Sequence, residues 1–159
     1  MMTTNKRSRV AACDGNGGQD AGACRLLSTH EVEELVGVPM RKGVLDADRT
    51  VPGTYCEWTR EGSDSAYDNP AAGIDIEERT DARARREFEK DRRSGATETF
   101  DGLGDQAFFY RGTLLDVQAG TTVLALIVTG DEERRVSDAE ARDLAVAAAR
   151  IVVRRIGRR

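Results

Sequence analysis

The segment AFFYRGTLLDVQAGTTVLALIVTG (Ala107–Gly130) decides the fold expected for this chain. It contains three strand-like runs separated by short glycine-containing turns: Ala107–Arg111, Thr113–Gln118 and Thr121–Gly130. Strands joined by turns this short pair antiparallel, because a parallel pair needs a long crossover connection. The last run is apolar on both faces, which predicts a central strand covered on two sides.

Two further strands are expected upstream of this meander. TYCEWTR (Thr54–Arg60) is rich in residues that favour strands or are readily buried. AGIDIEE (Ala72–Glu78) alternates isoleucines with acidic residues, which is typical of a half-buried strand. The chain therefore supplies about five strands in all.

Three helices are expected around these strands. The first begins at Ser28, which has capping-box spacing to Glu31, and with about two turns it is too short to persist alone in water. Thr80–Arg93 is densely charged and predicts a surface helix with a solvated outer face. The last helix follows a second capping box, Ser137 and Glu140, and has an apolar stripe at helical spacing.

The resulting order, α-β-β-α-β-β-β-α, predicts an α+β fold in which helices pack on a single antiparallel sheet. Residues 1–22 offer no periodic apolar face, and we expect them to form a disordered N-terminal segment that ends in a glycine-rich linker. Residues 23–159 are expected to form a single α+β domain.

Charge and composition exclude several classes of function. The chain has 159 residues and a formal net charge of −4, which argues against nucleic-acid binding. No apolar run approaches the roughly 20 residues that a membrane-spanning helix needs. One histidine and three cysteines, at unsuitable spacings, predict no metal site.

We identify no catalytic residue and no cofactor motif. His30 falls in the first turn of a helix, and no serine, cysteine or carboxylate can be tied to it by spacing, so a catalytic triad is unsupported. The segment Gly102–Asp105 contains a lone GxG, but a strand follows it rather than the helix that a phosphate cradle requires. We interpret it as a tight turn, and we expect the protein not to be an enzyme.

Five stretches, in this order, resemble one known family: ACRLLSTHEVEELVG, CEW, FDGLGDQAFF, LLDVQAGTTVLALIV and the alanine-rich last helix. The family is the group of actinobacterial exported lipoproteins called domain-of-unknown-function family 3558. In it a cysteine precedes a leucine pair and a capped helix, and a second cysteine lies beside a tryptophan on a strand. The resemblance covers Ala23 to Ile156. It implies an envelope location, a lipid anchor and no assigned activity.

The resemblance implies that Cys24 and Cys56 form a disulfide. Such a bond would tie the entry of the short first helix to the first strand. Closing a loop of about 33 residues would stabilise the fold by roughly 3–4 kcal/mol in the chain-entropy description. The alternative is two buried free thiols in a cytosolic protein, so the expectation of a bond depends on export.

The third cysteine, Cys13, follows Val10-Ala11-Ala12, which has the small-residue shape of a lipidation site. No apolar h-region lies between the preceding basic residues and Cys13, so the chain as written lacks the usual export signal. Either the start is truncated or altered and Cys13 carries the lipid, or the match is coincidental. We expect an extracytoplasmic protein, membrane-anchored or secreted.

Aromatic residues offer one hypothesis for a ligand cleft. Phe108 and Tyr110 share one face of their strand, while Phe109 takes the other. If the first pair lies beside Trp58 and faces solvent, the three rings form a shallow apolar cleft. The alternative is that all of them are core residues.

These observations favour a non-catalytic cell-envelope module, with a lipoprotein-like anchor, that binds an envelope protein, peptidoglycan or a small apolar ligand. The first alternative is a free-standing extracytoplasmic sensor-like domain that binds a ligand. A hydrolase with a cryptic site is the least favoured interpretation, because abundant carboxylates are not by themselves evidence of acid–base catalysis.

Overall fold

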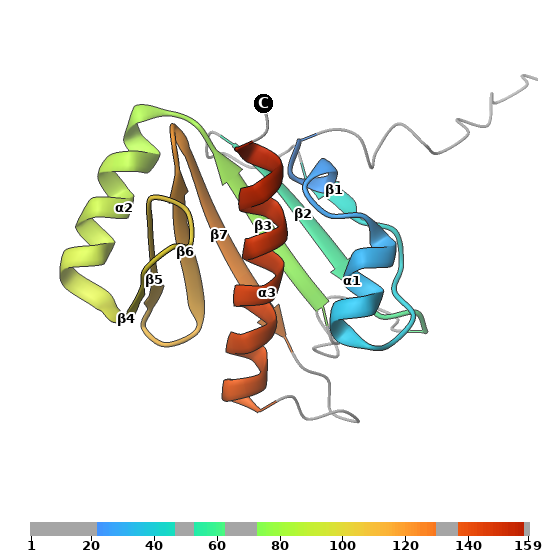
Figure 1. Ribbon diagram of the computed structural model, residues 1–159. Coiled ribbons are helices and arrows are strands. Elements are labelled where there is room, and N and C mark those ends of the chain that lie inside the picture. The colour runs from blue at the N-terminus through green and yellow to red at the C-terminus, as the bar shows by residue number, and fades with distance from the viewer. Residues whose placement is uncertain (1–21, 47–52, 63–72, 130–136, 158–159) are drawn as a thin grey trace, which may run out of the picture.

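The computed structural model describes residues 22–46, 53–62, 73–129 and 137–157 (Figure 1). The predicted N-terminal segment up to residue 21, with Cys13, lies outside the described residues. The described strands are β1 (Val44–Asp46), β2 (Thr54–Thr59), β3 (Gly73–Arg79), β4 (Ala96–Phe100), β5 (Gln106–Tyr110), β6 (Leu114–Ala119) and β7 (Thr122–Thr129). The described helices are the 3-10 turn η1 (Gly22–Arg25) and the α-helices α1 (Thr29–Val36), α2 (Ala82–Gly95) and α3 (Asp138–Ile156).

The strands form one antiparallel sheet in the order β1-β2-β3-β7-β6-β5-β4. This confirms the predicted α+β class with helices on a single antiparallel sheet. The expected strand number was wrong, since the described residues form 7 strands rather than about five, and the element order changes accordingly. The two additional strands, β1 and β4, lie at the two edges of the sheet, where pairing with one neighbour is enough to define a strand.

Helices cover the sheet on both faces. On β5, Ala107 and Phe109 belong to the main core with α1 and α3, whereas Phe108 between them packs against Phe88 of α2. Because successive strand residues point to opposite faces, α2 lies on the face opposite α1 and α3. Figure 1 shows α3 crossing the sheet beside α1, with α2 near the β4 edge.

The short helix α1 is fixed at its start. Ser28 and Glu31 form the predicted capping box, in which the Ser28 Oγ accepts from the Glu31 backbone N–H at 3.2 Å. Arg155 of α3 donates to the Leu26 carbonyl at 2.7 Å and to the Glu31 carboxylate at 2.9 Å. The tertiary contact that an 8-residue helix requires is therefore supplied largely by α3.

Removing the α1 cap is expected to destabilise the protein measurably. We expect Ser28→Ala to lower the free energy of unfolding by about 1 kcal/mol, since the Glu31 backbone N–H loses its acceptor. Urea unfolding followed by circular dichroism measures this change. Ser28→Thr keeps the hydroxyl and is the control; an equal loss in both variants would contradict the capping role.

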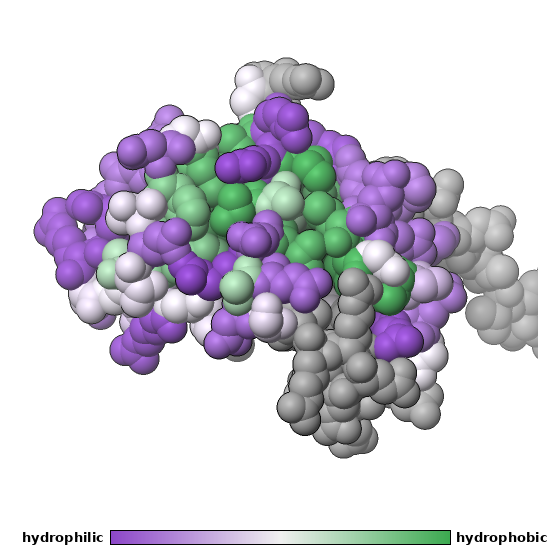
Figure 2. Space-filling model, turned by 60° about the horizontal axis from the view of Figure 1, so that its bottom comes forward, coloured by the Kyte–Doolittle hydropathy of each residue, from purple (hydrophilic) through white to green (hydrophobic). Residues whose placement is uncertain are grey.

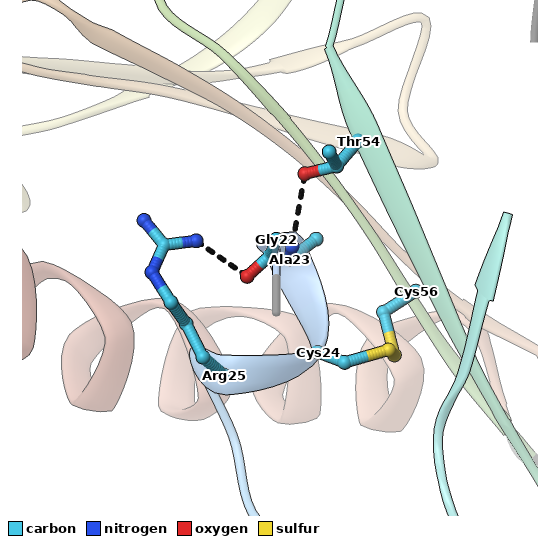
Figure 3. Close-up of a disulfide and its surroundings, with 6 residues drawn as sticks. All are labelled: Gly22, Ala23, Cys24, Arg25, Thr54 and Cys56. Carbon is cyan, nitrogen blue, oxygen red and sulfur yellow. Dashed lines mark hydrogen bonds between the residues drawn. A yellow bond between two sulfur atoms is a disulfide. The ribbon is translucent and has the colours of Figure 1, made fainter. Parts of the chain in front are cut away.

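As predicted, Cys24 and Cys56 lie at disulfide distance, with 2.00 Å between the sulfur atoms. Both residues are buried, and the bond joins η1 to β2. The Ala23 backbone N–H donates to the Thr54 Oγ1 at 2.9 Å, beside this bond (Figure 3). The Arg25 guanidinium donates two hydrogen bonds to the Glu78 carboxylate of β3, and the bond from Nη2 to Oε1 measures 2.6 Å. The chain before α1 is thus fixed to two strands.

Candidate functional site

The structure does not bring the predicted cleft residues together. Trp58 is 1% exposed and lies in the core shared by α1 and α3. Phe108 is fully buried on the opposite face, with its ring centroid 4.9 Å from that of Phe88. Tyr110 is half-buried against the Phe108 cluster. Trp58 lies on one face of the sheet, and Phe108 and Tyr110 lie on the other. These three residues therefore form no common cleft.

A groove of about 410 Å³ lies instead between α3 and the β4–β5 end of the sheet. We call it the α3 groove. Figure 2, viewed toward the end of the molecule where α3 begins, shows apolar residues reaching the surface among hydrophilic ones. The residues that line the groove come from β4, β5 and α3: Glu98, Phe100, Phe109, Ala139, Arg142, Asp143, Val146, Ala147 and Arg150.

Two phenylalanines form an aromatic wall of the groove. The Phe100 and Phe109 rings meet edge to face, with 5.5 Å between their centroids. Phe109 is 1% exposed, whereas Phe100 is only half-buried. Val146 of α3 is also half-buried and packs against the same core. These side chains give a ligand an apolar surface whose geometry is fixed by the packed core beneath it.

Arg142 is the principal polar residue of the groove. Its guanidinium carbon lies 4.8 Å from the Phe109 ring centroid, in a cation–π arrangement. One terminal nitrogen forms an ion pair with Glu98 of β4. The Nε atom is buried, and no acceptor for it is present among the described residues. A buried donor of this kind is costly, which makes Arg142 the strongest indication of a binding role in the groove.

The groove carries balanced charge at its rim. Arg142 and Arg150 contribute two cations, while Glu98 and Asp143 contribute two carboxylates. Glu98 is already paired with Arg142, so a bound anion would compete with Glu98 for the guanidinium. The arrangement suits a ligand that places an apolar body on the phenylalanines and one acceptor group at Arg142.

The sequence contained a signal for this site that our interpretation missed. Arg142 precedes Ala145 and Ala149 at helical spacing, so a charged residue occupies the buried stripe of α3. Phe109 lies on the strand face opposite Phe108, as predicted, whereas the predicted cleft used the Phe108 face. Helix α2 covers the Phe108 face, so no cleft forms beside that ring.

The exposed side of α2 is a solvated helix surface, as its charge run predicted. Arg86, Lys90 and Arg93 lie on it at helical spacing, and all three are exposed. Glu89 accepts from Arg92 at 3.0 Å on the same helix. This open surface presents long flexible side chains and has no apolar wall comparable with that of the α3 groove.

The remaining candidates occupy ordinary positions. His30 is exposed, with its Nε2 at 3.3 Å from a Glu34 oxygen. Within the described ranges, no group of three or more histidine, cysteine or acidic residues is arranged to hold a metal ion. None of the described helices combines the length and apolar character needed to cross a membrane. No family model, curated protein or solved structure matches the chain.

Proposed function

We propose that the protein is a non-catalytic binding module of the cell envelope, and that the α3 groove holds a small amphipathic molecule with an anionic head group. The observation that carries this proposal is the buried Nε–H of Arg142, which lacks an acceptor among the described residues and lies beside an apolar wall. Leaving such a donor unsatisfied costs about 1–3 kcal/mol. A ligand carboxylate or phosphate that replaced Glu98 at the guanidinium would remove that cost if the side chain turned its Nε–H toward the ligand.

The size and shape of the groove support a small molecule. Its volume of about 410 Å³ falls within the range of roughly 300–1,000 Å³ typical of ligand pockets. Phe100, Phe109 and Val146 would contact the apolar part of the ligand. Arg142 would then bind the head group with a charge-assisted hydrogen bond, and Arg150 would contribute favourable potential at the rim.

The disulfide supports the envelope location. A buried bond between Cys24 and Cys56 is compatible with an extracytoplasmic protein, since thiols in the cytoplasm are kept reduced. The resemblance of the sequence to exported lipoproteins points in the same direction. Within the proposal, lipid on Cys13 would anchor the module at a membrane surface, and the groove would face the envelope space.

Binding of decanoate and of decanol, measured by isothermal titration calorimetry near neutral pH, tests this proposal. We expect decanoate to bind at least tenfold more tightly than decanol, because the charged carboxylate forms an ion pair with the Arg142 guanidinium, whereas the hydroxyl of decanol accepts only a weaker, uncharged hydrogen bond. Arg142→Met keeps an unbranched apolar side chain and is expected to abolish the preference for decanoate. Equal affinity of the native protein for the two probes would refute the proposed head-group site.

Two further variants sharpen this experiment. Glu98→Gln removes the carboxylate that competes for Arg142, so we expect it to strengthen decanoate binding severalfold. Arg93→Met makes the same change of charge on the exposed surface of α2 and is expected to leave binding unchanged. A loss of decanoate affinity in Arg93→Met as large as that in Arg142→Met would mean that only overall charge matters.

A further inference from the structure

A second cavity lies on the other face of the sheet, beneath α2. Its volume is about 150 Å³, and strands β3, β6 and β7 form its base. We call it the α2 cavity. Phe88, Leu114 and Val123 supply apolar walls, and the carboxylates of Glu77, Asp91 and Asp116 also line it. This site is independent of the α3 groove, because the sheet lies between them.

Asp116 is buried in the middle of β6. It is only 7% exposed, and its Oδ2 atom is buried with no hydrogen-bond partner among the described residues. Its cross-strand neighbours are Phe108 on β5 and Ala125 on β7, neither of which has a side chain that donates a hydrogen bond. An ionised carboxylate in this position is unfavourable unless a cation or a hydrogen-bond donor contacts it.

The charged groups around Asp116 do not neutralise it. Burial is the largest cause that raises the pKa of Asp116, to about 7. The negative charges of Asp91 on α2 and Glu77 on β3 raise it further. The cation in the cavity wall, Arg79 of β3, is bound by Glu87 of α2, at 2.6 Å, and by Asp81. The residues from β7 that line the cavity, Val123 and Ala125, carry no charge. The lining of the cavity therefore holds four carboxylates, those of Glu77, Glu87, Asp91 and Asp116, and one cation, Arg79.

We propose that the α2 cavity binds a small organic cation, such as an alkylammonium group, with Asp116 as its direct partner. Glu77 and Asp91 strengthen the attraction, while Phe88 and Val123 contact the alkyl part. A water molecule occupies about 30 Å³ of liquid, so the cavity has room for a few non-hydrogen atoms. A metal ion fits less well, because none of the described residues forms a metal-binding cluster.

Titration with ethylammonium chloride at about pH 8, followed by two-dimensional amide NMR, tests this inference. We expect saturable shifts at amides of β6, β3 and α2 around the cavity, and none of these in an equal titration with sodium chloride. Below pH 7 the apparent dissociation constant is expected to rise about tenfold per pH unit, as protonation of Asp116 competes with the cation. Identical shifts with both salts would overturn the proposal.

Two variants assign the binding to Asp116. Asp116→Asn keeps the shape of the side chain and is expected to weaken ethylammonium binding at least tenfold. Asp91→Asn, on the half-buried side of α2, is expected to retain the fold and to weaken binding a few-fold. Unchanged affinity in either variant would show that the ammonium group binds elsewhere. Decanoate binding in the α3 groove is expected to remain intact in both variants.

Discussion

Removing the disulfide between Cys24 and Cys56 is expected to lower the free energy of unfolding by about 3–4 kcal/mol. The two cysteines are separated by 32 positions, and without the bond the unfolded chain regains the entropy of that open loop. The loss is a large fraction of the roughly 5–15 kcal/mol that stabilises a typical domain. We expect the loss to loosen first η1, which the bond ties to β2, and then α1, which follows η1 in the chain.

Urea unfolding of the native protein, with and without reductant, measures this loss directly. The double variant Cys24→Ala, Cys56→Ala is expected to unfold at the same lower urea concentration as the reduced protein and to be insensitive to reductant. Cys13→Ala controls for effects of the third thiol and is expected to behave as the native protein. A difference below about 1 kcal/mol between oxidised and reduced protein would contradict the structural role of the bond.

The second large effect is a pH-dependent gain of stability in Asp116→Asn. The unfolded chain releases the Asp116 proton near its ordinary pKa of 3.8, whereas in the folded protein the pKa is about 7. Between these values the folded state binds more protons than the unfolded state, so the native protein loses stability as the pH rises. Over about three pH units the penalty reaches roughly 4 kcal/mol, and asparagine does not incur it.

The measurement compares urea unfolding of native protein and Asp116→Asn at about pH 4.5 and about pH 8. We expect the variant to gain about 3–4 kcal/mol relative to the native protein between these two pH values. Asp105→Asn, in an exposed turn, is the control and is expected to show no comparable gain. A difference between native and variant that stays constant with pH would show that Asp116 ionises normally in the folded state.

The parts of the fold that the sequence predicted share a local physical cause. The cap of α1 depends on two residues three positions apart, Ser28 and Glu31, and its geometry is the same in any helix. The antiparallel pairing of the meander strands likewise follows from the short turns that connect them. Sequence patterns of this range do not depend on distant packing, and the class of fold followed from them.

The edge strands could not be predicted because their sequences lack a strand pattern. β1 has only 3 residues and contains an acidic one. β4, with the sequence ATETF, is mostly exposed and is held by pairing with β5, including a Thr97 hydroxyl that donates to the Phe109 carbonyl. Both are defined by the neighbour that they pair with, and that information lies elsewhere in the chain.

Tertiary packing also explains why the α3 groove and the α2 cavity could not be predicted. Asp116 alternates with Leu115 and Val117, which predicts a solvent-facing carboxylate, but α2 covers that face and buries it. β5 is buried on both faces, so its sequence does not indicate which phenylalanine borders a groove. The sequence shows Arg142 as a charged residue in the apolar stripe of α3, but its contact with Phe109 follows only from the packing of α3 over β5. Each residue acquires its role from an element far away in sequence.

The claim that the α3 groove is the ligand site is tested most directly by mapping decanoate onto the protein by amide NMR. We expect saturable shifts at amides of β4, β5 and the first half of α3, centred on Phe100, Phe109 and Arg142. The same map of Arg142→Met is expected to show these shifts only at much higher decanoate concentration. Shifts centred instead on α1 and β2, or no saturable shifts in the native protein, would contradict the proposed function.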